Sequence, residues 1–141
     1  MMLDLDPLTA VSPVDGRYAR HTARLRQTVS EYGLIRTRCL VELRWFQHLA
    51  QTPAISELPP LNDQQSAEID KVIRNFSKAD AEKVKVLEAT TNHDVKAVEY
   101  LVKEKISAIN GLSPYIEFVH FACTSEDINN LSHGLMLQTA M

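Results

Sequence analysis

Polar side chains gather in two short clusters in the last third of the sequence, each where a helix is expected to start. The first spans residues 90–94, Thr-Thr-Asn-His-Asp, and the second spans residues 123–130, Cys-Thr-Ser-Glu-Asp-Ile-Asn-Asn. The N-terminus of a helix carries unpaired backbone N–H groups and the positive end of the helix dipole, so it suits an anionic ligand. The two clusters therefore indicate a binding site for a molecule with carboxylates or phosphates.

The second cluster holds more polar groups than helix capping requires. Thr124 or Ser125 alone is enough, because one hydroxyl at the N-cap accepts a backbone N–H and contributes about 1 kcal/mol. Two carboxylates follow the hydroxyls, and Asn129 then stands inside the helix, where its amide competes with the backbone. Asn129 and His133 are four residues apart and share a face. Capping alone and a functional site both stay open on these residues.

The first cluster contains one side chain that capping does not explain, the imidazole of His93. Thr91 or Asn92 is expected to cap the following helix, with Asp94 favourable to its dipole. An imidazole can give or take a proton near neutral pH, or it can bond an anionic oxygen. The sequence offers His93 no nucleophile for a triad, and it contains no HExxH, CxxC or Gly-rich phosphate loop.

Apolar residues that recur at three- and four-residue steps predict the helices that position these clusters. The strongest pattern, over residues 32–50, predicts a helix buried on two sides, with Trp45 in the core. Further helices are expected over residues 19–29, from Asn62 or Asp63 to about residue 76, over 77–89 after a Ser77 capping box, and over 95–109. With no alternating strand pattern, the predicted fold class is all-α.

One side-chain pairing and one exposed apolar row are expected on these helices. Glu99 and Lys103 are four residues apart and should pair on the outer face of their helix. The final helix should begin at Thr124 or Ser125 and carry an exposed apolar row of Ile128, Leu131 and Leu135. It reaches the end of the sequence without Gly, Pro or a basic last turn, which predicts a fragment of a longer protein.

Composition excludes several classes of function. The chain has 141 residues, of which 45% are hydrophobic and 23% charged, and a net charge of -3 speaks against a nucleic-acid surface. No apolar run is long enough for a membrane span, and the N-terminus lacks a signal-peptide pattern. Cys39 and Cys123 fit no disulfide or metal framework, which favours a cytoplasmic protein. His21 and His120 are isolated and are interpreted as structural.

Three motifs make the sequence recognisable. They are Ser-Pro-Val-Asp-Gly-Arg-Tyr at 12–18, Thr-Thr-Asn-His-Asp-Val-Lys-Ala-Val-Glu-Tyr at 90–100, and Phe-Ala-Cys-Thr-Ser-Glu-Asp-Ile-Asn-Asn at 121–130. In this order they closely resemble the bacterial adenylosuccinate lyase family, within the fumarase/aspartase superfamily. Taken alone, Arg17 would be interpreted as a solvated surface charge.

The resemblance implies an enzyme that eliminates fumarate from adenylosuccinate to give AMP, and from the succinyl-carboxamide ribotide earlier in the same pathway. It implies no metal or organic cofactor. It also implies a homotetramer with a central helical bundle, in which each active site takes residues from three subunits.

The resemblance also assigns substrate-binding roles by motif. Arg17 would meet the phosphate of the nucleotide, and His93 would bond the substrate or assist the proton donor. Thr124 and Ser125 would hold a carboxylate of the succinyl group. The full set implied is Arg17, Tyr18, Asn92, His93, Asp94, Thr124 and Ser125.

The family's general-acid histidine and general-base serine lie downstream of these motifs and are absent from this sequence. We therefore expect residues 1–123 to form the N-terminal helical domain of the fumarase/aspartase-like fold. Residues 124–141 would be the first turns of a central-bundle helix, and the chain alone would be inactive. The alternative is a free-standing helical protein-interaction module.

Overall fold

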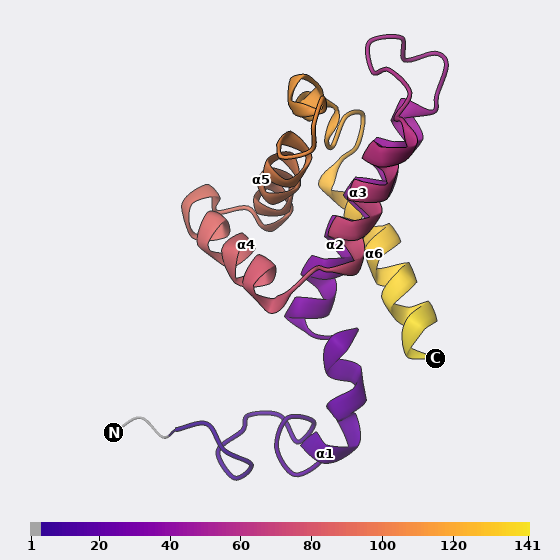
Figure 1. Ribbon diagram of the computed structural model, residues 1–141. Coiled ribbons are helices and arrows are strands. Elements are labelled where there is room, and N and C mark those ends of the chain that lie inside the picture. Colours follow the sequence, from indigo (N-terminus) through magenta and orange to yellow (C-terminus); the bar gives the residue numbers. More distant parts are fainter. Residues whose placement is uncertain (1–3) are drawn as a thin grey trace.

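The computed structural model describes residues 4–141, which form helices joined by turns and loops and contain no strand (Figure 1). The all-α prediction is confirmed for this part of the chain. Residues 1–3, at the start of the predicted N-terminal domain, lie outside the described residues. The helices are α1 (Ala19–Thr22), η1 (Ala23–Gln27), α2 (Glu31–Ala50), α3 (Asp63–Arg74), α4 (Lys78–Thr91), α5 (Asp94–Ser107), η2 (Ser113–Phe118) and α6 (Ser125–Ala140).

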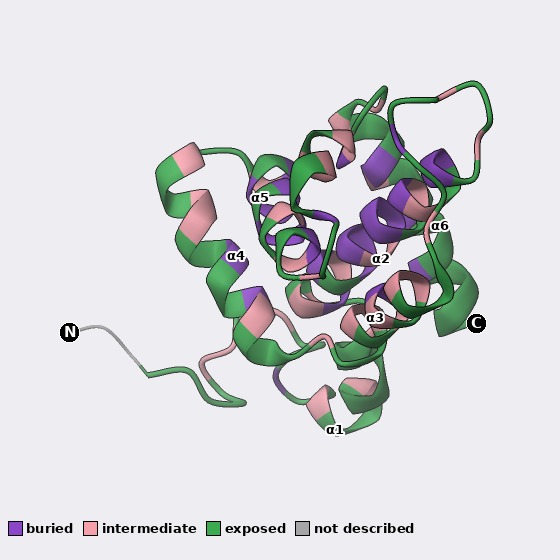
Figure 2. Ribbon diagram, turned by 45° about the horizontal axis from the view of Figure 1, so that its top comes forward, coloured by how far each residue is buried: buried purple, intermediate pink, exposed green. Residues whose placement is uncertain are grey.

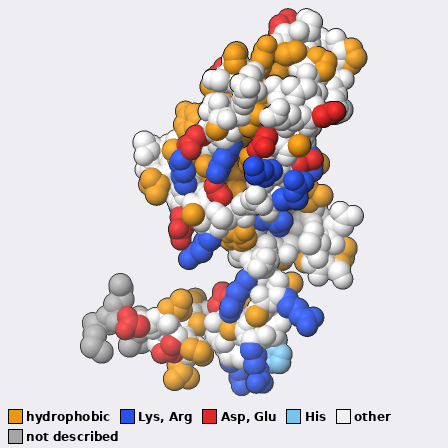
Figure 3. All heavy atoms as spheres, in the orientation of Figure 1, with side chains coloured by type: hydrophobic (Ala, Val, Ile, Leu, Met, Phe, Trp, Pro, Cys, Tyr) orange, Lys and Arg blue, Asp and Glu red, His pale blue; other side chains and the backbone are white. Residues whose placement is uncertain are grey.

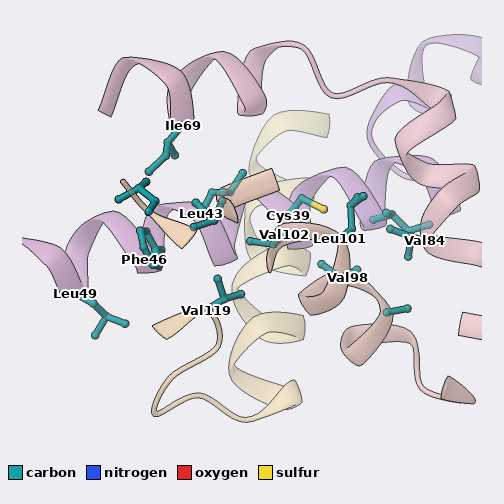
Figure 4. Close-up of a cluster of buried hydrophobic side chains, with 14 of the residues drawn as sticks. Cys39, Leu43, Phe46, Leu49, Ile69, Val84, Val98, Leu101, Val102 and Val119 are labelled. Carbon is teal, nitrogen blue, oxygen red and sulfur yellow. The ribbon is translucent and has the colours of Figure 1, made fainter. Parts of the chain in front are cut away.

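Helix α2 is the centre of the fold, and α3, α4, α5 and α6 all pack against it. Its buried face is continuous along its length (Figure 2). Figure 4 shows side chains of α2 meeting those of α3, α4, α5 and the segment after η2. The labelled core residues are Cys39, Leu43, Phe46, Leu49, Ile69, Val84, Val98, Leu101, Val102 and Val119. This apolar packing sets the positions of the helix ends around it.

Side-chain caps determine where most of the longer helices begin. Ser77 forms the predicted capping box with Asp80, and Asn62 forms another with Gln65. In each box the N-cap side chain accepts a backbone N–H and the third residue returns the bond, which satisfies two otherwise unpaired donors. Helix α4 extends two residues past the expected end at residue 89, to Thr91.

Three predictions of burial were wrong in detail. Trp45 is only partly buried, because its indole N–H donates to the carbonyl oxygen of Phe121 at 2.7 Å near the surface. Glu99 does pair with Lys103, at 3.1 Å, but it is buried rather than on an outer face. In the apolar row of α6, Ile128 is buried against α2 and α5, whereas Leu131 is 60% exposed.

Residues 4–27, which we call the N-terminal arm, extend away from the other helices (Figure 1). Neither α1 nor η1 contains a buried residue. Figure 3 shows Lys and Arg side chains along this arm, to which the sequence contributes Arg17, Arg20, Arg24 and Arg26. The arm therefore contributes little apolar burial to the fold.

Candidate functional site

The N-termini of α5 and α6 meet, which brings the two polar clusters of the sequence together. Nε2 of His93, at the start of α5, lies 3.5 Å from Oγ of Ser125, the first residue of α6. These residues are 32 positions apart in the sequence. We call His93, Asp94, Thr124 and Ser125 the helix-start cluster. Two positive helix ends thus face one small region of the surface.

The imidazole of His93 is itself the N-cap of α5, so the prediction that Thr91 or Asn92 caps this helix was wrong. Nδ1 of His93 accepts the backbone N–H of Lys96 at 3.2 Å. Asn92 instead ends α4 in the left-handed conformation, with φ of 50°, which Asn tolerates better than most residues. Because Nδ1 accepts a hydrogen bond, the neutral imidazole carries its proton on Nε2, which faces Ser125.

The two hydroxyls of the second cluster have different tasks. Thr124 is the N-cap of α6, and its hydroxyl both accepts the N–H of Asp127 at 3.3 Å and donates to the carboxylate of Asp127 at 2.9 Å. The backbone N–H and the hydroxyl of Thr124 together lower the pKa of Asp127. Ser125 is not used as a cap. Its hydroxyl is therefore the one directed at His93 and open to a ligand.

Arg38, a residue that the sequence analysis did not single out, connects the two clusters from the buried side. Arg38 of α2 is 4% exposed, and its Nη2 lies 2.7 Å from Oδ2 of Asp94. Its Nε donates to Oδ1 of Asn129 in α6 at 2.9 Å. Burial alone would raise the pKa of Asp94, but the N–H of Val95 and the guanidinium of Arg38 outweigh burial and lower it. Asp94 is therefore an ionised, fixed carboxylate.

Asn129 and His133, expected to share one face of their helix, have separate environments. Asn129 is the partner of Arg38 and is partly buried, so its place inside the helix is explained by this hydrogen bond. His133 is exposed one turn later. The excess of polar groups in the second cluster thus combines a capping box, an interhelix bond and one open hydroxyl.

Arg17 and Tyr18 do not join the helix-start cluster in this chain. The guanidinium of Arg17 lies over the ring of Tyr18, 5.4 Å from its centroid, and Tyr18 packs against His21. Both residues belong to the N-terminal arm, which points away from α5 and α6 (Figure 1). Of the predicted site, the structure brings together the second and third motifs and leaves the first apart.

His120, expected to be an isolated residue, pairs with a buried carboxylate. Its Nδ1 lies 2.6 Å from Oε1 of Glu42, a residue of α2 that is fully buried. Burial raises the pKa of Glu42, against the opposing effect of His120. The other carboxylate oxygen, Oε2, has no hydrogen-bond partner among the described residues. This pair ties the segment before α6 to the central helix.

Comparison with known proteins assigns the chain to a family. Residues 16–141 match the family described as Lyase. The chain belongs to this lyase family. The adenylosuccinate lyase of Haemophilus influenzae is 55% identical over 138 residues, and those of Vibrio cholerae and Escherichia coli K12 are 54% identical over the same length. The chain spans about 30% of the length of these relatives, while the matches cover 98% of this chain.

Membership of the lyase family confirms the resemblance inferred from the three motifs and the N-terminal helical domain expected from it. The division between residues 123 and 124 stays a prediction. Within residues 4–141, no group of three or more His, Cys, Asp or Glu side chains is placed to hold one metal ion. In the same part of the chain no helix combines the length and apolar character needed to cross a bilayer.

Beside the helix-start cluster, this lyase-family chain has an open apolar groove between α2 and α6. Its volume is about 750 Å³. Apolar side chains of both helices line it, with Leu131 and Leu135 of α6 exposed along its edge. The groove therefore presents apolar side chains of α2 and α6 to solvent.

Proposed function

We propose that the chain is the N-terminal part of an adenylosuccinate lyase, a purine-biosynthesis enzyme of the cytoplasm. Its substrates would be adenylosuccinate, which yields AMP and fumarate, and the succinyl-carboxamide ribotide. The approach of His93 Nε2 to Ser125 Oγ, between two helix N-termini, is the observation that carries this proposal. The names of the relatives support it.

The cluster fits the electrostatic demand of a fumarate elimination. A base removes the proton beside a carboxylate of the succinyl group, and an acid protonates the leaving nitrogen. Negative charge grows on that carboxylate as the proton leaves, so fixed N–H and O–H donors stabilise the transition state more than the substrate. The Ser125 hydroxyl and the Nε2–H of His93 are donors of this kind. The proposed reaction uses no metal or organic cofactor.

The general acid and the general base would come from outside these 141 residues. The complete protein would assemble as a homotetramer, so neighbouring copies would contribute to each site. Two observations support assembly. The N-terminal arm holds Arg17 and Tyr18 away from the helix-start cluster of its own chain, so they would serve the nucleotide in another subunit. The groove between α2 and α6 leaves Leu131 60% and Leu135 38% exposed, which suits burial against further helices.

The same groove favours the second candidate function, a free-standing helical module that binds a partner protein. The two candidates differ in whether the reading frame continues past Met141. They also differ in chemistry. The module would release no fumarate, whether it is made as residues 1–141 or from the complete reading frame.

The test is fumarate release from adenylosuccinate by protein made from the complete reading frame, expressed in a host without its own adenylosuccinate lyase. We expect turnover by the complete protein and none by residues 1–141 alone. General acid and base steps each contribute about 10²–10⁴-fold, and both groups are proposed to lie outside residues 1–141. Fumarate release that follows residues 1–141 through purification would contradict this assignment. An inactive, folded complete protein would contradict the function itself.

A further inference from the structure

Arg38 is a buried cation that contacts both helices of the helix-start cluster. It reaches Asp94 at the start of α5 at 2.7 Å and Asn129 in α6 at 2.9 Å. Arg38 is 4% exposed, and a buried charge is costly unless it is paired and hydrogen-bonded. Because the guanidinium is planar and rigid, its two bonds fix α5 and α6 relative to each other. Asn129 lies one helical turn after Ser125, so this link acts close to the cluster.

The link to Asp94 also decides where the carboxylate points. Oδ1 of Asp94 accepts the N–H of Val95 at 2.8 Å and lies 3.7 Å from Nδ1 of His93. An ionised carboxylate only accepts hydrogen bonds, so a closer approach to Nδ1 would require a proton there. With Oδ2 held by Arg38, the carboxylate stays back and Nδ1 accepts the N–H of Lys96 instead.

The consequence concerns the other ring nitrogen. A neutral imidazole has one N–H, and the hydrogen bond made by one nitrogen sets the state of the other. The N–H at Nε2 faces Ser125 only while Nδ1 remains an acceptor. If Asp94 turned to His93, the proton would move to Nδ1 and the cluster would lose its donor on the open side.

We propose that Arg38 is a positioning residue, which holds Asp94 away from Nδ1 of His93 and thereby keeps the imidazole proton on Nε2, opposite Ser125. The effect on turnover rests on the proposed function. The effect on the tautomer does not, and it can be measured in this chain without any substrate.

The first experiment is ¹⁵N NMR of His93 in residues 1–141 at alkaline pH, where imidazoles are neutral. We expect the Nε2–H form in the wild type and a shift of the population toward Nδ1–H in Arg38→Gln. The double variant Arg38→Gln with Asp94→Ala should return to Nε2–H, because the competing carboxylate is gone. Lys105→Gln is the matched control. It breaks a 2.5 Å ion pair with Asp80 at the far end of α5 and should leave the tautomer unchanged.

Two outcomes would overturn the proposal. One is a wild-type His93 that carries its proton on Nδ1. The other is a helical, folded Arg38→Gln that keeps the wild-type tautomer. If Arg38→Gln does not fold, hydrogen exchange in the wild type tests the proposal instead. The Nε–H of Arg38 is buried and bonded, so it should exchange slowly with solvent. Rapid exchange of that proton would also overturn the proposal.

The second experiment measures the kinetics of the complete protein. Displacing a donor by about 1 Å can cost about 10²-fold in rate, so Arg38→Gln should lower kcat by up to that factor with little change in KM. Lys105→Gln should keep both constants. An inactive wild-type protein with the expected tautomers would contradict the proposed function and leave the role of Arg38 intact. Normal kcat in Arg38→Gln would contradict the positioning role.

Discussion

The helix-start cluster and the N-terminal arm differ in how firmly the fold holds their candidate residues. His93 and Ser125 stand on helices that pack on α2, and Arg38 joins those helices from the core. Arg17 and Tyr18 stand on an arm whose helices bury nothing, and they contact mainly each other and His21. The core therefore determines the geometry of the cluster, whereas it does not determine the geometry of the arm.

The largest effect expected from this comparison concerns the imidazole of His93. In the complete protein, His93→Asn should lower kcat/KM for fumarate release by about 10²–10⁴-fold, because a donor or proton-transfer group is lost. Asn is among the best N-cap residues, so the start of α5 should be kept and Tm should change little. His133→Asn, which replaces an exposed histidine of α6, is the control. A large loss of Tm with intact turnover would give His93 a purely structural role.

The next effect tests the core that holds the cluster. Phe46 of α2 is fully buried, and Phe46→Ala should reduce the free energy of unfolding by about 3–5 kcal/mol because it leaves a cavity among packed side chains. Tyr18→Ala, in the N-terminal arm, should reduce it by less than about 1 kcal/mol. Urea unfolding followed by circular dichroism of residues 1–141 measures both. Equal losses would mean that the arm is as well packed as the core.

A smaller effect separates the two hydroxyls of the cluster. In the complete protein, Ser125→Ala should cost about 2.7–4 kcal/mol in kcat/KM, the usual loss for one donor to a developing charge. Its stability should be nearly unchanged, because Thr124 and not Ser125 caps α6. Thr124→Ala should instead lower stability by about 1 kcal/mol through loss of the cap. Unaltered kinetics in Ser125→Ala would remove it from the site.

The local parts of this site could be predicted from the sequence, and the long-range parts could not. The Ser77 capping box and the start of α6 depend on residues three positions apart, so their patterns were sufficient. Arg38 was missed because its partners lie far along the chain, 91 positions away for Asn129. An arginine within an apolar stripe was the signal available. His93 as a cap was missed because imidazole is not among the usual capping groups.

The burial of two further side chains could not be predicted from helical periodicity, again because it depends on partners elsewhere in the structure. Glu99 looked like an outer-face residue beside Lys103, but it is buried, and the ammonium groups of Lys96 and Lys103 lie 2.8 Å and 3.1 Å from its carboxylate oxygens. Trp45 looked like core, but its indole N–H needs an acceptor, which the carbonyl oxygen of Phe121 supplies near the surface. In both cases the deciding partner is a specific atom and not a face of a helix.

The smallest effect contrasts a buried carboxylate of the core with an exposed one. Burial raises the pKa of Glu42 above the ordinary value of 4.5, so between that pH and its folded-state pKa the folded chain binds more protons than the unfolded chain. Stability from this group is therefore complete below about pH 4.5 and is lost as pH rises through the folded-state value. Glu42→Gln should remove the loss, amounting to about 1.4 kcal/mol for each pH unit between the two pKa values.

The measurement is the difference in unfolding free energy between Glu42→Gln and wild type from pH 4 to pH 8, with the exposed Glu57→Gln as control. Taking the difference cancels Asp94 and Asp127, whose pKa values are lowered and whose stabilisation is lost toward acid. The difference for Glu42→Gln should increase with pH, while that for Glu57→Gln stays flat. A difference that falls with pH would mean that His120 stabilises the charged carboxylate of Glu42 more than burial destabilises it.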